Sequence, residues 1–166
     1  MIKNLFISTG RARSVGVTLM ELMIVMLVIA VLASIAYPSY VNQVRKSKRA
    51  VAKSALLDAA NRQEQYYSGN RAYADAMNKL TGYTTLPGAT ILFDKDGGVT
   101  TVGADAIYAV SVAGIDAATC GTLPCFKIQA VPQNDQANDD CGTYTITSDN
   151  TRDVSNSTST PASECW

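Results

Sequence analysis

The residues able to form covalent cross-links are four cysteines in the C-terminal half of the 166-residue chain: Cys120, Cys125, Cys141 and Cys165. None of them forms a C-x-x-C pair, so their spacing does not favour a structural zinc site. An even number of cysteines in a polar region that follows an apolar segment indicates disulfides in an oxidising compartment. Four cysteines allow three pairings, and we expect the local one, Cys120 with Cys125 and Cys141 with Cys165.

The sequence contains no histidine, which excludes Ser-His and Cys-His nucleophile pairs and imidazole metal sites. We therefore expect no catalytic residue, no metal site and no cofactor, and we expect the protein not to be an enzyme. The formal net charge is zero, so no overall electrostatic field attracts nucleic acid.

Glu21 is the one charged residue in an apolar segment that extends from Val17 to Tyr37. This segment has close to the ~20 residues that span a hydrocarbon core as a helix. A carboxylate there costs up to about 2.5–3.5 kcal/mol and favours a cationic partner. If the chain is cut between Gly16 and Val17, the new α-amine lies four residues before Glu21 and can neutralise Glu21 of a neighbouring subunit.

Two simpler interpretations of the same segment are a plain transmembrane anchor and a secretory signal peptide. For the signal peptide, Lys3, Arg11 and Arg13 would form the charged region, but no clean A-x-A cleavage site follows the apolar run. Basic residues flank the segment on both sides, so the positive-inside rule does not decide the topology.

Residues 13–22, RSVGVTLMEL, resemble the leader and cleavage motif of type IV prepilins, in which a glycine is usually followed by F-T-L-I-E-L. The resemblance implies cleavage after Gly16 by a prepilin peptidase, N-methylation of Val17 and a role for Glu21 in assembly. The sequence departs from the motif at Val17, where phenylalanine is usual, and its leader is longer than the commonest ones.

Pro38 matches the family as well, because residues 36–40, AYPSY, resemble a segment in which a proline kinks or locally melts the helix. The resemblance implies other pilin subunits as partners, together with the prepilin peptidase and an inner-membrane assembly platform. It places the chain in the inner membrane before assembly, as a single-pass protein with a periplasmic C-terminal domain. After assembly the chain would lie in an extracellular pilus of a Gram-negative-type bacterium.

The domains expected on this basis are a leader at 1–16, an apolar helix half at 17–44 and a globular head at 45–166. No turn signal interrupts the chain between Ser39 and Tyr67. After Val51, small and apolar side chains recur with the period of one helix face: Ala52, Ala55, Leu56, Ala59, Ala60, Gln63 and Tyr67. We expect one helix of about 50 residues that ends near 68–70.

The polar half of the chain contains stretches of alternating residues at 107–112, 126–131 and 142–147, preceded by a hairpin at 90–102 with an Asp-Gly-Gly turn. Counted as four β-like stretches, with the hairpin as one of them, these segments and their short connections predict an α+β fold, with a four-stranded antiparallel sheet packed on the long helix. The resemblance implies the ladle shape of pilins, with a disulfide-closed segment at 141–165, the D-region.

The Cys165-Trp166 end and the start of the last predicted strand at 141–143 resemble the PilE/ComP group of pilins and minor pilins. The function implied is that of a structural subunit of a type IV pilus, major or minor, which serves twitching motility, adhesion and natural transformation. A ComP-like DNA-binding minor pilin, acting as a DNA-uptake receptor, is one alternative. A type II secretion pseudopilin is another, which the two cysteine pairs and the long tail disfavour.

Contacts to DNA phosphates require lysine or arginine. In the predicted head, Lys127 on a strand and Arg152 in the D-region are the candidates, and DNA is the corresponding partner. The basic cluster at 45–49 is better explained by lipid headgroups before assembly and by charge pairs between subunits afterwards.

Overall fold

The structure, a computed structural model, describes residues 16–86, 88–158 and 160–166. The chain divides into two compact units, one that ends at Tyr40 and one from Val41 to Trp166. The leader expected at 1–16 lies, except for Gly16, outside the described residues.

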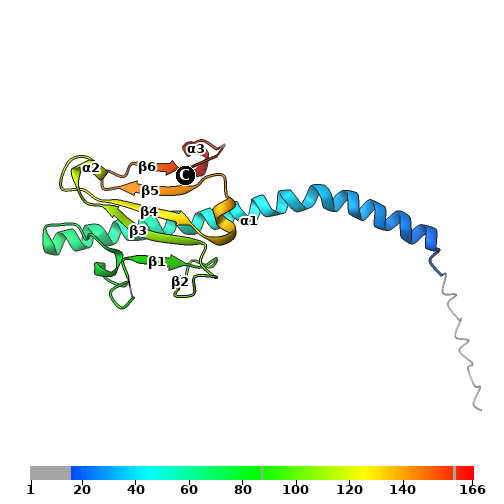
Figure 1. Cartoon of the computed structure of the whole chain (residues 1–166), viewed down its shortest axis with the longest axis horizontal. Helices are drawn as coiled ribbons and strands as arrows, with labels where there is room; N and C mark the ends of the chain where they lie inside the picture. The colour runs from blue at the N-terminus through cyan, green and yellow to red at the C-terminus, as the bar shows by residue number, and fades with distance from the viewer. Residues whose placement is uncertain (1–15, 87, 159) are drawn as a thin grey trace, which may run out of the picture. The chain divides into compact units, whose positions relative to one another are not determined.

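Helix α1 runs from Leu19 to Asn70 and contributes to both units (Figure 1). Pro38 lies inside α1, although proline lacks the N–H that would bond to the carbonyl of Ser34. Residues 34–40 nevertheless stay helical, because one missing bond is a small part of the ladder of so long a helix. The structure therefore shows no local melting at Pro38.

In the second unit, α1 buries one face made mostly of small residues, and the expectation from helical periodicity is confirmed. Its buried residues are Ala52, Ala55, Leu56, Ala59 and Gln63. Alanines at the spacing of one helix face let a sheet approach the helix backbone closely. The Val41–Asn70 part of α1 is therefore one layer of the head.

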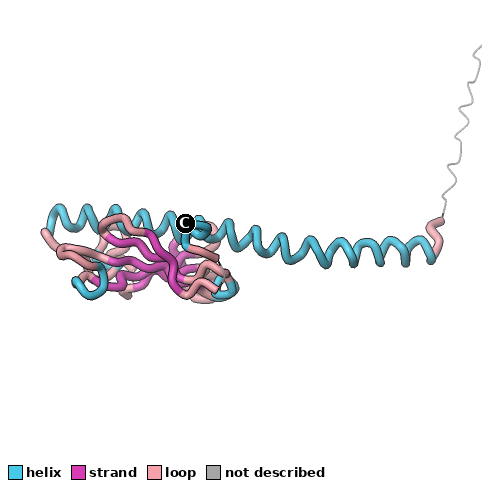
Figure 2. The backbone as a smooth tube through the Cα atoms, turned by 90° about the horizontal axis from the view of Figure 1, so that it is seen from above, coloured by secondary structure: helices cyan, strands magenta, loops and turns pink. Residues whose placement is uncertain are grey.

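A single antiparallel sheet forms the other layer, and in the described residues it has six strands in the order β2-β1-β3-β4-β5-β6. The strands are β1 (Thr90–Phe93), β2 (Val99–Thr100), β3 (Tyr108–Gly114), β4 (Lys127–Pro132), β5 (Thr143–Thr147) and β6 (Arg152–Ser155). Figure 2 shows these strands gathered on one side of the helix. The helix and sheet layers confirm the α+β class.

The expected number of four strands is too low. The hairpin predicted at 90–102 forms, with Leu92 opposite Thr100 and Phe93 opposite Val99, but its second strand is only two residues long. The sixth strand, β6, pairs with β5 from Thr143↔Ser155 to Ile146↔Arg152. Its sequence, RDVS, has one apolar residue and no signal of alternation, so local sequence could not predict it.

The core lies between the two layers. It contains the inward-facing residues of the three central strands: Tyr108, Val110, Ile128, Ala130, Tyr144 and Ile146. The described residues also contain four short helical segments: η1 (Met77–Lys79), α2 (Ala117–Cys120), η2 (Asn134–Asn138) and α3 (Ala162–Cys165). The first of them, η1, lies in the loop that follows α1.

Gln63 fixes the loop after α1 to the helix. It is fully buried, its side-chain amide donates to the Ala74 carbonyl at 2.8 Å, and its carbonyl accepts from the Ala74 N–H at 2.9 Å. One side chain thus satisfies both backbone groups of a buried loop residue.

We expect Gln63→Ala to destabilise the head by about 2–4 kcal/mol, because it leaves two buried backbone groups unpaired at roughly 1–3 kcal/mol each. Urea unfolding of the full chain in detergent micelles, followed by the fluorescence of the single tryptophan Trp166, measures the change. Gln65→Ala, at an exposed position of the same helix, is the control and should change stability by less than about 0.5 kcal/mol. Equal effects of the two substitutions would contradict this role.

Candidate functional site

The residues from Val17 to Tyr40, which include the apolar half of α1, are exposed, and Val17 itself is 70% accessible. Gly16, Val17 and Thr18 precede the helix and are not helical, so the Gly16–Val17 peptide bond lies in an open segment. Long and apolar, α1 qualifies as a helix able to cross a membrane. The arrangement fits a helix that is covered by lipid or by other helices.

Glu21 lies in the first turn of α1, and this turn has a cap that the sequence analysis missed. The Glu21 N–H donates to the Thr18 hydroxyl at 3.2 Å, so Thr18 caps the helix. Thr18-Leu19-Met20-Glu21 has the T-x-x-E spacing of a capping box, a signal present in the sequence. Within the described part of the chain Glu21 forms no ion pair, so its carboxylate is available to a partner.

Both disulfides join cysteines that are near in sequence. Cys120 is bonded to Cys125 and Cys141 to Cys165, and all four residues lie in the described ranges. Cys141 and Cys165 are fully buried and belong to the core. The second bond therefore fixes the C-terminus of the chain to the core beside β5.

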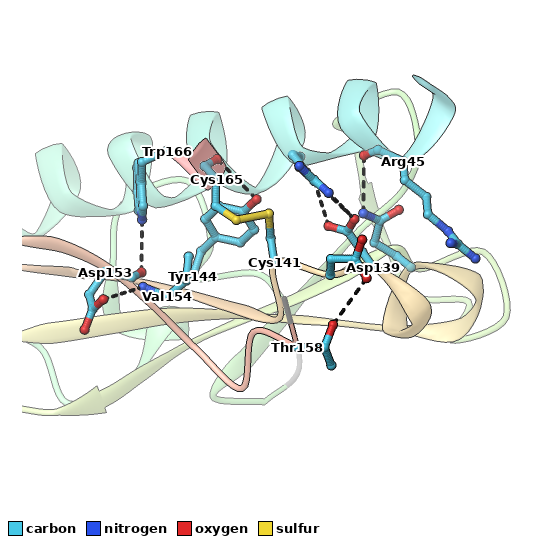
Figure 3. Close-up of a disulfide and its surroundings, with 12 residues drawn as sticks. Arg45, Asp139, Cys141, Tyr144, Asp153, Val154, Thr158, Cys165 and Trp166 are labelled. Atoms are coloured by element: carbon cyan, nitrogen blue, oxygen red, sulfur yellow. Dashed lines mark hydrogen bonds and ion pairs between the residues drawn. A yellow bond between two sulfur atoms is a disulfide. The ribbon is translucent and has the colours of Figure 1, made fainter. Parts of the chain in front are cut away.

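The C-terminal residues pack on β5 and β6, as Figure 3 shows. The Tyr144 hydroxyl donates to the Cys165 carbonyl at 3.3 Å, and the Trp166 indole N–H donates to the Asp153 carbonyl at 3.0 Å. The Trp166 ring meets the Tyr144 ring edge-on at 5.6 Å between centroids, and the Arg152 guanidinium lies 5.5 Å from the Trp166 centroid. These contacts fix the C-terminal residues Cys165 and Trp166 to β5 and β6.

A buried ion pair fixes the loop before Cys141 to the helix. The Arg49 guanidinium donates to both carboxylate oxygens of Asp139, at 2.6 Å from Nη2 and 2.8 Å from Nε. The two side chains are 11% and 2% exposed. The Asp139 carboxylate raises the pKa of Arg49, which keeps the arginine charged.

The assignment of Arg49 to lipid headgroups or to subunit contacts is therefore corrected, because Asp139 already neutralises it inside the head. Next to this pair, the Gln136 amide donates to the Arg45 carbonyl at 3.3 Å and to the Tyr108 hydroxyl at 3.2 Å. Arg45 keeps its side chain outside this network and forms no ion pair within the described residues.

A second network joins α1 to the loop at 81–86. The Asp58 carboxylate accepts from Arg62 at 2.6 Å and from the Tyr83 hydroxyl at 2.7 Å, and Arg62 also donates to the Thr81 carbonyl. Burial raises the pKa of Asp58, but the hydrogen bonds from Arg62 and Tyr83 outweigh it and the net pKa is lowered. Burial, with the neighbouring carboxylate, raises the pKa of Tyr83 to about 12.

These shifts predict a loss of stability at high pH. Tyr83 has a higher pKa in the folded than in the unfolded state, so its contribution is full below about pH 10 and is lost between about pH 10 and 12. We expect the difference in unfolding free energy between the wild type and Tyr83→Phe to be constant from pH 7 to 9.5. It should shrink at higher pH, and urea titrations followed by Trp166 fluorescence check this. A difference that stays constant to pH 11.5 would contradict it.

The structure does not bring the two candidate DNA contacts together. Lys127 on β4 is opposite Thr147, and Ile146 is opposite Arg152. Opposed residues of antiparallel strands share a face of the sheet, and successive residues alternate between faces. Since Ile146 is buried under the helix, Arg152 projects from the helix-side face and Lys127 from the outer face.

The surroundings of Lys127 and Arg152 differ too. Arg152 is stacked on Trp166 and bonded to the Asn150 side chain at 3.4 Å. Lys127 lies beside uncharged polar residues that the strand register places on the same face, Gln129, Thr145 and Thr147. In the described part of the chain neither cation has an ion-pair partner, and the same holds for the exposed Arg71 at the end of α1.

A metal site is not evident: among the residues that the structure describes, no group of three or more cysteine, aspartate and glutamate side chains could hold an ion. The geometry is that of a capped apolar helix with one acid in its first turn, continuous with a disulfide-closed head. This combination defines the class of type IV pilins.

Comparison with known families makes the assignment more particular. A family model described as "Type IV minor pilin ComP, DNA uptake sequence receptor" matches residues 38–145, and one described as "Prokaryotic N-terminal methylation motif" matches residues 13–37. Because the first match covers more than half of the chain, the protein belongs to the family of the type IV minor pilin ComP, and it is a type IV pilus subunit.

Among solved structures, a type IV pilin from Shewanella oneidensis matches with 20% identity and a TM-score of 0.45, over 74% of this chain and 97% of that one. A comparison with curated proteins found no match.

Proposed function

We propose that this chain is a minor subunit of a type IV pilus that binds DNA during its uptake. The observation that carries the proposal is the family match over residues 38–145, which includes strands β1 to β4 and most of β5, because that family is described as a DNA uptake sequence receptor. Membership of the pilin family gives the chain other pilin subunits as partners and a membrane-anchored form that assembles into a pilus.

The outer face of the sheet supplies a surface suited to DNA. Phosphates are bound by lysine and arginine, and hydroxyl and amide side chains supply further hydrogen bonds to phosphate, sugar and base edges. Beside Lys127 the register places Gln129, which can serve as such a group, whereas Thr145 is buried and the Thr147 hydroxyl is bonded to Asp149. Asp153 lies opposite Thr145 on the same face, so phosphate contacts would be confined to the Lys127 end of this surface. Arg152 packs on Trp166 on the other face, so it would contact a different part of any ligand.

The membrane segment supplies the assembly half of the function. A prepilin peptidase would cut the open segment between Gly16 and Val17, and methylation would follow at the new Val17 terminus. Glu21 would then meet the terminal amine of a neighbouring subunit, with Pro38 in the part of the helix that packs in the filament. The head, with its two disulfides, would form in an oxidising periplasm, and an inner-membrane platform would add the subunit to the pilus.

DNA binding by the full chain in detergent tests the proposal. We expect a labelled duplex to bind with an affinity that falls as salt rises from about 50 to 200 mM. Lys127→Gln should weaken binding by about fivefold and reduce the salt slope by about 1, as the loss of one phosphate contact does. Arg152→Gln tests the helix-side face of the sheet. If it weakened DNA binding more than Lys127→Gln does, the DNA site would be assigned to that face instead.

Lys79→Gln is the matched control, because Lys79 is exposed and already paired with Asp75 at 2.7 Å. It should leave both affinity and salt slope unchanged. If the wild-type chain bound no duplex at about 50 mM salt, or bound it without salt dependence, the DNA-binding function would be withdrawn.

A further inference from the structure

A hollow with unpaired charges of both signs lies at the base of the head. Its volume is about 290 Å³, and α1 lines it with Asn42, Arg45 and Lys46. Across from the helix it is lined by Asp140, Thr160 and Glu164. All of these residues belong to the unit from Val41 to Trp166.

Most of the charged side chains that line this hollow have no ion-pair partner among the described residues. Of the charged residues that line it, Arg49 and Asp139 form an ion pair at 2.6 Å. Arg45, Lys46, Asp140 and Glu164 form none with any described residue, and the Asp140 carboxylate has one neutral donor, the Thr158 hydroxyl at 3.2 Å. Two cations thus face two anions across a space that a ligand can enter.

The position of the cations along the chain indicates which ligand is near. Tyr37 and Tyr40 end the apolar segment with the residue type that favours membrane interfaces. In the sequence, Arg45 and Lys46 follow Tyr37, where the apolar segment ends, by eight and nine residues. Basic residues that closely follow a membrane segment are attracted to lipid headgroups, so a headgroup is a ligand within reach of these two cations.

We propose that this hollow binds the headgroup of a phospholipid that carries a primary ammonium, such as phosphatidylethanolamine. Arg45 and Lys46 would contact the phosphate, and Asp140 and Glu164 would accept hydrogen bonds from the ammonium. A choline headgroup has no N–H to donate, and a glycerol headgroup has no cation for the carboxylates. The volume of about 290 Å³ is many times the ~10–15 Å³ that a single water needs on the same measure, so the hollow has room for a phosphoethanolamine group.

The proposal rests on the membrane-anchored state given under the proposed function and adds a specificity to it. Before assembly, the head would bind the membrane through one type of lipid headgroup. Entry of the subunit into a pilus would then require release of that lipid from the base of the head.

Native mass spectrometry of the full chain in detergent tests this site. The lipids are an equimolar mixture of phosphatidylethanolamine and phosphatidylcholine with identical acyl chains. We expect the ethanolamine adduct to exceed the choline adduct by about fivefold. The double substitution Asp140→Asn with Glu164→Gln should bring the ratio close to one, and Arg45→Gln with Lys46→Gln should lower both adducts.

The matched control is Lys53→Gln with Asp105→Asn, which removes the same types of charge away from the hollow and should leave the ratio unchanged. Soluble phosphoethanolamine should compete for the site, whereas inorganic phosphate at equal concentration should compete less, which separates headgroup binding from anion binding. Trp166 fluorescence checks that each variant is folded.

A wild-type ratio near one overturns the proposal without the need for any variant. A preference that survives Asp140→Asn with Glu164→Gln overturns it as well, because the lipid would then bind elsewhere. If these substitutions instead lower only the incorporation of subunits into pili, the hollow is a contact between subunits and not a lipid site. Pilus incorporation and DNA binding of the same variants report separately on the proposed function.

Discussion

Asp139→Ala should destabilise the head by about 3–5 kcal/mol, because it leaves the Arg49 charge in the interior without a partner. Arg49 is 11% exposed, and it donates three hydrogen bonds to Asp139 at 2.6–3.1 Å. Urea titration of the full chain in detergent, followed by Trp166 fluorescence, measures the change. Trp166 follows Cys165, whose disulfide partner Cys141 is two residues after Asp139, so the probe reports on this part of the fold.

Two comparisons separate the loss of a buried pair from a general effect of removing charge. The double substitution Arg49→Met with Asp139→Leu should be less destabilising than Asp139→Ala, since it leaves no unpaired charge inside the protein. Asp75→Ala removes an exposed partner of Lys79 and should cost less than about 1 kcal/mol. If Asp139→Ala cost no more than Asp75→Ala, Arg49 would have to be neutralised or hydrated in another way.

Glu21→Ala should lower the incorporation of the subunit into pili by more than about tenfold, because an intramembrane carboxylate is retained only where it has a partner. The chain is a pilus subunit by family, and Glu21 is the single charge in its apolar segment. Quantitative immunoblotting of sheared pili against the membrane pool measures incorporation. The substitution should not change the membrane pool, since it removes a charge from the membrane.

Because Thr18 caps α1 and Glu21 has the spacing of the acidic residue in a capping box, the test must separate charge from capping. Glu21→Gln keeps the capping-box spacing, which accepts Glu or Gln, but removes the charge. We expect it to fail in assembly as Glu21→Ala does, while Thr18→Val, which loses the cap at a cost of about 1 kcal/mol, should retain most incorporation. Normal incorporation of Glu21→Gln would show that the cap and not the charge is required.

Several features could be predicted from the sequence because their causes are local. The buried face of α1 is set by the 3.6-residue period from Ala52 to Gln63, and the β1–β2 hairpin by the Asp-Gly-Gly turn after Phe93. The local pairing of the cysteines, which the structure contains, was favoured by the turn between Cys120 and Cys125. The motif around Gly16 and Glu21 is likewise a pattern of neighbouring residues.

The tertiary structure decided the features in which two distant segments meet. Arg49 and Asp139 are 90 positions apart, and each by itself has the sequence signature of an exposed charge. β6 is a strand because β5 offers it an edge and Trp166 donates to its Asp153 carbonyl. Lys127 and Arg152 project from opposite faces of the sheet because of the register between β4, β5 and β6. The residues next to either one in the sequence do not determine that register.

The physical reason is the range of the forces that act in each case. Helical periodicity, turns and caps depend on residues within about four positions. The sequence by itself therefore determined the apolar half of the long helix, the capping signal and the acid in its first turn, and the class of pilin subunit. Strand register, burial of a charge and the hollow at the base of the head depend on which segments pack together. The burial of the core as a whole determines which segments make those contacts, so only the folded chain shows them.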